Sequence, residues 1–291
     1  MPDIAVAAVQ FRLKRYRRSG AFWEDVRRHV EEAARQGAQL IVFPEYVTAL
    51  LLGQTAPMDN GAACEFLHDR TDEVLSTFSS LSRTFGVVIL GGTHVHRENG
   101  RYFNEAFLFF PDGRMGRQKK LHLTPEERNE WPLSPGDGLT VFDTPVGPVG
   151  IAICYDVEFP EVGRLLADAG AEWLLCPSFT ETKAGYYRVR VCCRARATEN
   201  QMYAVMSGLI GRLPDVPQIE TAYSRAAAFA PCDEPFPPDG VLAQGRSNTG
   251  ETIVCAVASD RLSINRTLGR VAPFFDRRSD RYGEWKPRRF T

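Results

Sequence analysis

The segment most informative about the fold reads Gly150-Ile-Ala-Ile-Cys154-Tyr-Asp156-Val-Glu158-Phe-Pro160-Glu161. It predicts a buried strand over residues 149–153, a polar turn that starts at Cys154, and a helix that begins near Pro160. This arrangement suits an activated nucleophile, because the turn lifts the thiol off the sheet and nearby backbone N–H groups can hold an oxyanion. A lone cysteine at a strand end is more often a buried core residue. Its role therefore depends on the rest of the chain.

The composition of the chain argues against several classes of protein. Its 291 residues are 44% hydrophobic and carry a formal net charge of −1. The length suits one large domain or two small ones, and because no linker is long enough to separate two domains we expect a single domain over residues 1–291. The charge balance gives no reason to expect a nucleic acid or a membrane as partner. The sequence has no apolar run long enough for a membrane span, and its N-terminus lacks the pattern of a signal peptide. Seven cysteines in such a chain are typical of reduced thiols, so we expect a cytoplasmic protein.

Metal-binding residue types do not form a recognisable pattern. The sequence has neither a Cys-x-x-Cys nor a His-x-x-x-His pair. His94 and His96 have the spacing of two residues on one strand face, but two ligands without a nearby third are more often ordinary polar residues. We expect no metal and no organic cofactor.

Apolar strands alternate with amphipathic helices along the chain. We expect strands at residues 4–10, 40–43, 87–90, 102–110, 115–123, 141–144, 149–153, 173–176, 201–208, 226–230 and 252–257, and helices at 22–36, 62–85, 160–169 and 183–200. Gly91 and Gly92 should end the third strand, residues 124–137 should form a loop or a short helix, and residues 261–291 show little periodicity. Several strands pair through hairpins, which favours mixed sheets covered by helices over a purely parallel sheet.

A cysteine nucleophile needs a base, because an unperturbed thiol with a pKa of about 8.5 is mostly protonated at neutral pH. None of the five histidines lies in a context that indicates such a base. Glu45 is the clearest candidate, since it follows an apolar strand and Pro44, and burial can raise the pKa of a carboxyl group toward neutrality. Lys119 and Lys120 point to opposite faces of a strand, so one of them can face an oxyanion. Each residue alone is more often a solvated surface group.

Taken together, these residues match a known family in the order of their motifs and in the residues around them. Phe43-Pro44-Glu45-Tyr46, Lys120-Leu-His122-Leu123 and the segment from Cys154 to Glu161 resemble the three signatures of the nitrilase superfamily, the carbon–nitrogen hydrolases. Further similarity lies at Pro135-Gly136-Asp137, Pro177-Ser178, Arg194-Ala-Arg196-Ala-Thr-Glu199-Asn200 and Asp276-Arg277-Arg278-Ser-Asp280-Arg-Tyr282. The resemblance covers nearly the whole chain and is nearest to a poorly characterised amidase-like branch.

This resemblance implies a fold and an assembly. The fold is α/β with mixed sheets, a four-layer α-β-β-α sandwich. The assembly is a homodimer, or a higher oligomer, built around helices near the nucleophile and the C-terminal tail at about residues 261–291.

The resemblance also implies roles for individual residues. Glu45 corresponds to the general base, Lys120 to the lysine that stabilises the oxyanion, and Cys154 to the nucleophile. The family often has a second glutamate after the lysine, which orients the lysine or helps to position the base. Glu127 matches that place best, with Glu126 and Glu130 as alternatives.

Candidate substrate-binding residues lie beside these motifs: Tyr46, Tyr155, Glu158, Ser178 and Phe179. Amidases that act on small dicarboxylic or α-keto amides often have an arginine where this chain has Glu158. If Glu158 faces the pocket, it disfavours carboxylate substrates and favours a neutral or amine-bearing amide. Alternatively, it only complements the dipole of the helix that follows.

The expected reaction is hydrolysis of a non-peptide C–N bond in a small amide through a cysteine thioester. Hydrolysis of an N-carbamoyl amine or of a nitrile on the same three residues remains an alternative. Nitrile hydrolysis is less favoured, because nitrilases tend to have tryptophan at the position of Tyr155. The alternative of another class is a non-catalytic scaffold with this fold. Such scaffolds usually lose one of the three residues, and this chain retains all of them.

Overall fold

The computed structural model describes residues 3–284, whose strands form one sheet that folds back on itself. The strand order is β5-β4-β3-β2-β1-β9-β8-β7-β6, with β13 beside β1, β10 and β11 beside β9, and β12 beside β11. The strands are β1 (Asp3–Arg12), β2 (Leu40–Val42), β3 (Val88–Glu98), β4 (Arg101–Phe109), β5 (Met115–Lys119), β6 (Val141–Thr144), β7 (Gly147–Ile151), β8 (Trp173–Ser178), β9 (Tyr203–Arg212), β10 (Thr221–Ala222), β11 (Ala227–Phe229), β12 (Val241–Gln244) and β13 (Glu251–Ala258).

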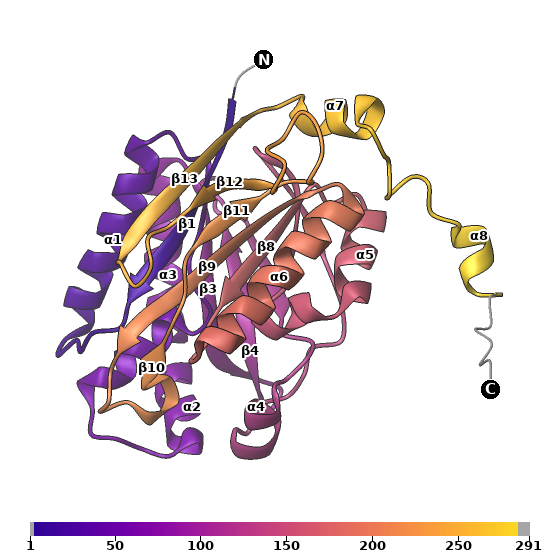
Figure 1. Cartoon of the computed structure of the whole chain (residues 1–291). Coiled ribbons are helices and arrows are strands. Elements are labelled where there is room, and N and C mark those ends of the chain that lie inside the picture. Colours follow the sequence, from indigo (N-terminus) through magenta and orange to yellow (C-terminus); the bar gives the residue numbers. More distant parts are fainter. Residues whose placement is uncertain (1–2, 285–291) are drawn as a thin grey trace.

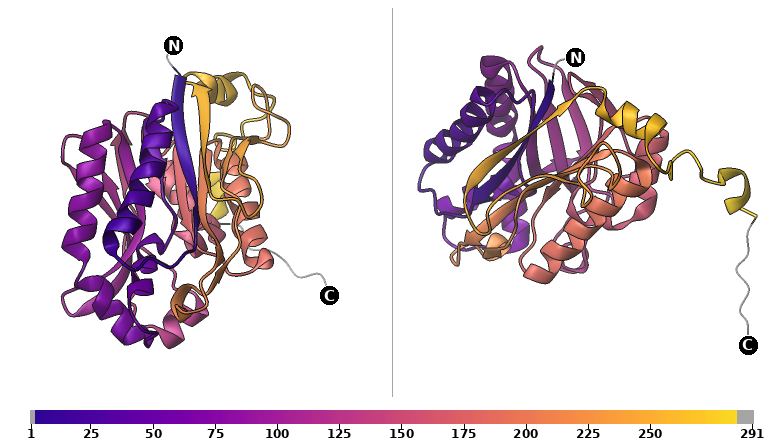
Figure 2. Two further views of the ribbon diagram at one scale, coloured as in Figure 1. Left: turned by 90° about the vertical axis from the view of Figure 1, so that its left-hand side faces the viewer. Right: turned by 45° about the horizontal axis from the view of Figure 1, so that its top comes forward.

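Helices cover both outer faces of the folded sheet (Figure 1). They are α1 (Ser19–Arg35), α2 (Asn60–His68), α3 (Thr71–Phe85), α4 (Pro125–Glu130), α5 (Pro160–Asp168), α6 (Lys183–Asn200), α7 (Arg261–Leu268) and α8 (Ser279–Tyr282), with 3₁₀ helices η1 (Val47–Gln54), η2 (Cys154–Glu158) and η3 (Pro217–Ile219). Helices α1 and α3 lie outside one half of the sheet, and α5 and α6 lie outside the other (Figure 2). The predicted four-layer α-β-β-α sandwich is therefore confirmed.

Strand β1 joins the two halves of the sheet. It pairs with β2 in parallel and with β13 in antiparallel orientation. At its end, residues 10–12 pair in parallel with residues 208–210 of β9. The two halves meet along this short seam and face each other elsewhere (Figure 2).

The side chains of β1 alternate between two cores, as a strand covered on both faces requires. Val6 and Ala8 belong to the core that fills the space between the facing halves and extends under α5 and α6. Ala7 and Val9 belong to the core between the first half and helices α1 and α3. A shift of one residue in register would exchange these sets, so the pairing of β1 is strongly specified.

Helix α1 shows why the outer layers hold to the sheet. Phe22, Val26, Val30 and Ala33 recur every three or four residues, and all four are fully buried. The helix ends at Arg35, and Gln36 caps it before Gly37, which has a φ of 83°. Burial of each large side chain stabilises the packing by about 1.5–3 kcal/mol.

The predicted helix over residues 62–85 is wrong, because the structure has two helices there. Helix α2 ends at His68, and α3 begins at Thr71, whose hydroxyl donates to the carbonyl oxygen of His68. Asp72 and Glu73 occupy the first turn of α3, where acidic side chains complement the helix dipole. Apolar periodicity continues across the break, so the pattern alone joins the two helices.

The prediction that Gly91 and Gly92 end the third strand is also wrong. Strand β3 continues through them to Glu98, and its register with β4 shifts between Leu90 and Thr93. Glycine commonly marks such a bulge inside a strand. This bulge lies beside Pro44, the residue before Glu45.

The C-terminal region contains more regular structure than its sequence indicates. Helices α7 and α8 lie in the range for which little periodicity was expected, and β12 has no counterpart among the predicted strands. The predicted contribution of residues 261–291 to a dimer concerns in part residues 285–291, which lie outside the described residues. Helix α7 packs on the body of the fold with Leu262 and Asn265 buried, and the chain beyond it extends away toward α8 (Figure 1).

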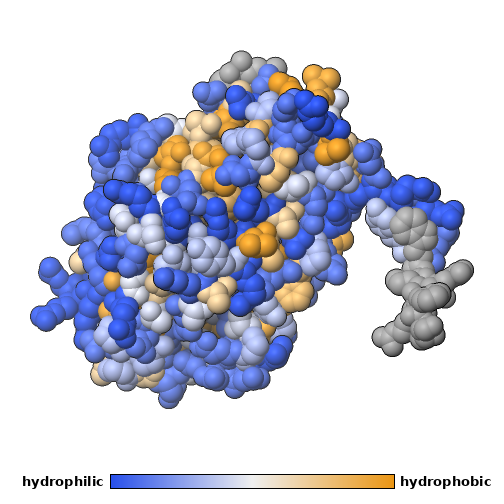
Figure 3. All heavy atoms as spheres, viewed as in Figure 1, coloured by the Kyte–Doolittle hydropathy of each residue, from blue (hydrophilic) through white to orange (hydrophobic). Residues whose placement is uncertain are grey.

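The face shown in Figure 3 is mainly hydrophilic, with separate hydrophobic patches. On α5 and α6, Leu165, Tyr187 and Val191 are more than half exposed. An assembly through these helices stays a prediction, because the structure describes one chain. Within residues 3–284, no helix is both long and apolar enough to cross a bilayer.

Candidate active site

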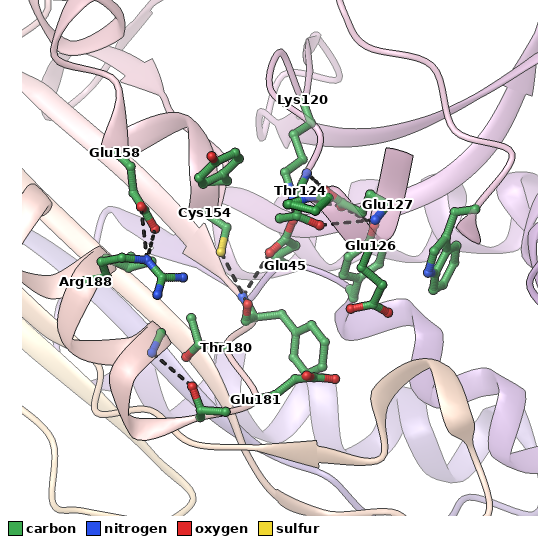
Figure 4. A pocket seen from close by; sticks show the side chains of 18 of the residues that line it. Glu45, Lys120, Thr124, Glu126, Glu127, Cys154, Glu158, Thr180, Glu181 and Arg188 are labelled. Atoms are coloured by element: carbon green, nitrogen blue, oxygen red, sulfur yellow. Dashed lines mark hydrogen bonds and ion pairs between the residues drawn. The ribbon is translucent and has the colours of Figure 1, made fainter. Parts of the chain in front are cut away.

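A cavity of about 350 Å³ opens where several strands end. The segments after β2, β5, β7 and β8 reach it, together with α4 and the first turns of α6. Eight of the predicted site residues line it: Glu45, Tyr46, Lys120, Glu127, Cys154, Tyr155, Glu158 and Phe179. Figure 4 shows how the labelled members of this set converge.

Glu45 follows β2 and is 1% exposed. The turn that carries it is fixed by close contact between Pro44 and Gly92, where an added Cβ would lie 2.0 Å from the Pro44 carbonyl oxygen. Gly92 also has a φ of 69°, a conformation that glycine adopts without strain. Glu45 Oε1 accepts a hydrogen bond from Lys120 Nζ at 2.8 Å, and Oε2 accepts one from the Phe179 amide at 3.0 Å.

Lys120 stands directly after β5 and is 2% exposed. Its neighbour Lys119 points to the other face and pairs with Glu98 at 2.9 Å. Lys120 Nζ donates to Glu45 Oε1 at 2.8 Å and to both oxygens of Glu127, at 2.8 and 2.7 Å. An ammonium group has three N–H donors, so all of them are directed at carboxylates.

Glu127 is the glutamate that meets Lys120. It occupies the third position of α4, whose capping box joins the Glu127 side chain to the Thr124 amide and the Thr124 hydroxyl to the Glu127 amide. Glu126 lines the cavity and Glu130 is exposed. Neither of these two has a hydrogen bond or an ion pair with Lys120 in the described part of the chain. Helix α4 lies within the segment predicted as a loop or a short helix.

Cys154 begins η2 immediately after the buried segment that follows β7. Its φ of 45° is in the left-handed region, which is strained for a residue with a Cβ. The thiol donates to the carbonyl oxygen of Phe179 at 3.3 Å. Asp156 joins this turn to the lysine segment, because its carboxylate accepts from the amides of Leu121 and His122 at 3.2 and 2.8 Å.

The charges of the site are buried and coupled. Burial and Glu127 raise the pKa of Glu45 above its ordinary value, although Lys120 opposes them. Burial would lower the pKa of Lys120, but Glu127 and Glu45 outweigh it and keep the ammonium charged. Burial alone would raise the pKa of Glu127, and Lys120 lowers it instead. Burial and the Glu45 charge raise the pKa of the Cys154 thiol. The resting site therefore holds a neutral thiol beside a carboxyl group with an increased proton affinity.

Comparison with known proteins decides the family. Residues 5–256 match the family model described as carbon-nitrogen hydrolase. The chain belongs to the carbon-nitrogen hydrolase family. The predicted resemblance to the nitrilase superfamily is thereby confirmed.

Two curated relatives are matched by this carbon-nitrogen hydrolase over only part of their length. The chain is 37% identical over 279 residues to the probable hydrolase YhcX of Bacillus subtilis, covering 96% of this chain and 54% of the relative. It is 30% identical over 182 residues to omega-amidase NIT2-B of Xenopus laevis, covering 60% of this chain and 63% of that protein. The chain thus spans between about half and two thirds of the relatives' length.

A solved structure with the same architecture is the carbon-nitrogen hydrolase of Helicobacter pylori. It superposes with a TM-score of 0.79 at 23% identity and covers 97% of each chain. At this identity the comparison supports the fold alone.

Among the predicted substrate-binding residues, Ser178 does not reach the cavity. It is fully buried in β8, and its hydroxyl donates to the carbonyl oxygen of Cys176 at 3.2 Å. Tyr46 lines the cavity, donates from its hydroxyl to Glu127 and stacks against Trp131. Tyr155 lines the cavity next to the nucleophile.

Glu158 faces the cavity but does not present a free charge. Both of its oxygens accept from Arg188 Nε, at 3.0 and 3.1 Å. Glu158 also lies two residues before Pro160, where α5 begins, so it is close both to the cavity and to the start of that helix. Figure 4 shows Glu158 and Arg188 on one side of Cys154 and Glu126 on the other.

Two residues of this carbon-nitrogen hydrolase site were not predicted from the sequence. Asn104 on β4 donates to Glu45 and Glu127, at 3.0 and 3.2 Å. Arg188 on α6 pairs with Glu158. Strand alternation could have placed Asn104 on an inward face, but it names no partner. Arg188 lies in an arginine-rich helix, where nothing distinguishes it from its neighbours.

One further cluster contains metal-ligand types. His96, Glu98 and Glu105 bring their ligand atoms within 4.8 Å of one another. Arg117 donates to Glu105 at 3.0 and 2.9 Å, and Lys119 donates to Glu98 at 2.9 Å. These cations already neutralise the carboxylates, which favours an ion-pair network at the edge of the sheet over a metal site.

Proposed function

We propose that this chain is an amidase-type hydrolase that cleaves the C–N bond of a small amide through a thioester on Cys154. The observation that supports this most strongly is that the backbone of one residue, Phe179, contacts both thiol and carboxylate. The carbonyl oxygen of Phe179 accepts from Cys154, and the amide of the same residue donates to Glu45. Nucleophile and base are therefore positioned by the same residue at the bottom of the cavity.

The first step is proton transfer from Cys154 to Glu45, followed by attack of the thiolate on the amide carbon. Glu45, Glu127 and Lys120 carry two carboxylates and one ammonium group. One carboxylate is thus in excess and can accept one proton without leaving an unpaired cation. The increased proton affinity of Glu45 assigns that proton to Glu45.

The second element is a donor for the oxyanion. Protonation of Glu45 weakens its attraction for Lys120, because a neutral carboxyl group is a poorer acceptor than a carboxylate. One N–H of Lys120 can then turn to the developing oxyanion, while Glu127 retains the other two. The backbone N–H of Tyr155 is the second proposed donor.

Collapse of the tetrahedral intermediate completes acylation. The C–N bond breaks, Glu45 returns its proton to the leaving nitrogen, and ammonia or an amine departs from the thioester. A water molecule then gives a proton to Glu45 and attacks the thioester carbon. The C–S bond breaks, the proton returns to Cys154, and a carboxylic acid is released.

Charges around the cavity favour a neutral or amine-bearing amide over a carboxylate substrate. The charged residues among those that line it are the glutamates Glu45, Glu126, Glu127, Glu158 and Glu181 and the cations Lys120 and Arg188. Both cations are bonded to glutamates. Glu126 and Glu181 have no ion pair within residues 3–284, and burial, together with Glu126 and Glu220, raises the pKa of Glu181. The opening is therefore electronegative.

A panel of substrates tests the reaction class. Wild type and Cys154→Ala are incubated with small amides, N-carbamoyl amines and nitriles, and ammonia release and intact mass are recorded. We expect turnover of amides by wild type alone, with a mass adduct on Cys154. Turnover restricted to carbamoyl amines or nitriles would replace the amidase assignment. If no compound is turned over and no adduct forms, the result favours a non-catalytic scaffold.

A matched series tests the substrate class. Pentanamide and its ω-amino and ω-carboxylate derivatives have the same reacting group and differ in terminal charge. We expect kcat/KM for the carboxylate derivative to be at least about tenfold below the other two, a difference of about 1.4 kcal/mol. A preference for the carboxylate derivative would contradict the electrostatic argument without affecting the reaction class.

A further inference from the structure

Asn104 closes a ring of hydrogen bonds in the candidate site. Its side-chain Nδ2 donates to Glu45 Oε1 at 3.0 Å and to Glu127 Oε1 at 3.2 Å. The same two oxygens accept from Lys120 Nζ, each at 2.8 Å. Two nitrogens and two oxygens therefore alternate around the ring, and both carboxylates are held on two sides.

Asn104 also supports Lys120 through the backbone. Its carbonyl oxygen accepts from the Lys120 amide at 2.9 Å, extending the pairing of β4 with β5 by one residue. The side chain is 1% exposed. One residue thus fixes the position of the ammonium group and of both acids.

We propose that Asn104 is a positioning residue that holds Glu45 and Glu127 at a fixed separation and keeps Glu45 ready to accept the proton of Cys154. The expected effect of Asn104 on substrate turnover rests on the proposed function. The effect on the acid–base behaviour of the site does not depend on any substrate.

The side-chain amide of Asn104 is suited to this position because it carries no charge. A second cation at this place would pair the excess carboxylate and remove its capacity to accept a proton. A third carboxylate would repel the other two and favour their protonation. An amide NH₂ supplies two donors and adds no charge.

The remaining atom of the amide supports a functional reason for this residue. Asn104 Oδ1 is buried and has no hydrogen-bond partner within the described residues. A buried acceptor without a partner destabilises a fold. The opposite orientation would place this oxygen against two carboxylates, so the NH₂ group must face the acids. Buried polar atoms without partners, which break a general rule of folded proteins, are concentrated at functional sites.

A pH profile distinguishes positioning from simple packing. The titratable groups that influence Glu45 are Lys120, Glu127 and Cys154, and its charge in turn influences Tyr46 and Cys176. Asn104 donates to the ionised form of Glu45 and so favours that form. Removing this donor shifts the protonation of Glu45 to higher pH, and the acid side of the activity profile follows.

The experiment uses Asn104→Leu, Asn104→Asp and a matched control, Asn265→Leu. Asn265 is equally buried, donates to the Glu234 carbonyl oxygen at 2.9 Å, and contacts none of the site residues named above. The rate of Cys154 alkylation by iodoacetamide is measured by intact mass from about pH 5 to 9, a range that brackets thiol and carboxyl titration. Cys154→Ala identifies the adduct among the seven cysteines.

We expect the acid-side midpoint of alkylation to rise by about half a pH unit to one unit in Asn104→Leu and further in Asn104→Asp. For an amide turned over by wild type, kcat should fall about tenfold or more in Asn104→Leu, with KM within about twofold. The control should keep the wild-type midpoint, whatever its melting temperature.

An unchanged midpoint in folded Asn104→Leu and Asn104→Asp would overturn the proposal. If both fail to fold, Asn104→Ser decides, because its shorter polar side chain lacks the NH₂ group that bonds the two acids, so the proposal predicts a raised midpoint. A wild-type midpoint in that variant would equally overturn it. A shifted alkylation midpoint without turnover of any panel compound would support the role of Asn104 and contradict the proposed function, so the two failures are distinguishable.

Discussion

Glu127 accepts two hydrogen bonds from Lys120 Nζ, at 2.8 and 2.7 Å, whereas Glu45 accepts one from the same nitrogen. The lysine is therefore held mainly by Glu127, and Glu127 is in turn fixed by the capping box at the start of α4. This unequal sharing leaves Glu45 as the acid that can change its charge without releasing the ammonium group.

Glu127→Gln should reduce kcat by about 10²- to 10³-fold, within the range of losses seen when groups that support proton transfer are removed. The glutamine keeps the shape of the side chain but gives up one acceptor oxygen and the negative charge that holds Lys120. Glu126→Gln is the matched control, because Glu126 precedes it in the same helix and lines the cavity without contacting Lys120. Equal losses in the two variants would contradict the assignment of Glu127.

Cys154→Gly should be more stable than Cys154→Ala by about 1 kcal/mol, although both lack turnover. The φ of 45° at this position strains any residue with a Cβ, and glycine adopts it freely. Urea unfolding of the two variants measures the difference. Greater stability of the alanine variant would mean that the turn is not strained.

Glu45 and Glu127 should affect the pH dependence of stability in opposite ways. Burial raises the pKa of Glu45 above 4.5, so the folded chain retains a proton that the unfolded chain has lost. The free energy of unfolding therefore falls as the pH rises from 4.5 through this raised pKa. Lys120, acting against burial, lowers the pKa of Glu127 below 4.5. The stability that Glu127 contributes is thus present above 4.5 and is lost as the pH falls through its lowered pKa.

Urea unfolding at a series of pH values tests this contrast. Relative to wild type, Glu45→Gln should gain stability as the pH rises above 4.5, the ordinary value for glutamate. Glu127→Gln should lose relative stability as the pH rises toward 4.5 from below. Glu130→Gln serves as the exposed control and should follow wild type. Parallel curves for the two buried variants would refute the opposite pKa directions.

Arg188 and Glu158 should adjust substrate choice in opposite directions. Arg188→Met leaves Glu158 unpaired at the cavity, so selection against the carboxylate derivative of pentanamide should increase about three- to tenfold. Glu158→Gln should decrease it by a similar factor. The Arg188 side chain is 62% exposed, which keeps the effect modest. The measurement is kcat/KM for the charged and neutral amides, and a change of the same sign in both variants would speak against the electrostatic account.

Gly92→Ala should destabilise the fold by about 2–4 kcal/mol and displace Glu45. Its Cβ would meet the Pro44 carbonyl oxygen at 2.0 Å in a backbone with a φ of 69°. Gly86→Ala is the matched control, because Gly86 has a φ of 66° and nothing within 4 Å of its Cβ. The control measures backbone strain alone, at about 1–2 kcal/mol. Similar values for both variants would show that the Pro44 contact is unimportant.

The resemblance to the nitrilase superfamily predicted the layers of the fold and a shared site for Glu45, Lys120 and Cys154. In the structure each of the three residues follows a strand, β2, β5 or β7, and so reaches the same cavity. Asn104 was not predicted, because the alternation of side chains along a strand assigns a residue to one face of the sheet but does not identify its hydrogen-bond partner. Here that partner, Glu45, lies more than fifty positions away in the sequence. The pairing of Glu158 with Arg188 was missed for the same reason, and with it the neutralisation of Glu158.

Two errors in the predicted elements have local causes. Thr71 starts a new helix where apolar spacing continues unbroken from α2 into α3. At Gly91 and Gly92, two glycines indicate the end of a strand by composition, whereas pairing with β4 carries the strand past them. At the first place the new helix begins with a local hydrogen bond from Thr71 to His68, whereas at the second the strand depends on pairing with another strand.

The pairing of β1 with β9 and β13 has a consequence for folding during synthesis on the ribosome. Gln10 of β1 pairs with Gly208 of β9 and Glu251 of β13, so its partners are translated long after it. At about 5–20 residues per second, this apolar strand waits for tens of seconds with edges that could pair with other nascent chains. The sandwich closes only when synthesis has passed β13. Until then, we expect β1 to stay unpaired along the segments that later meet β9 and β13.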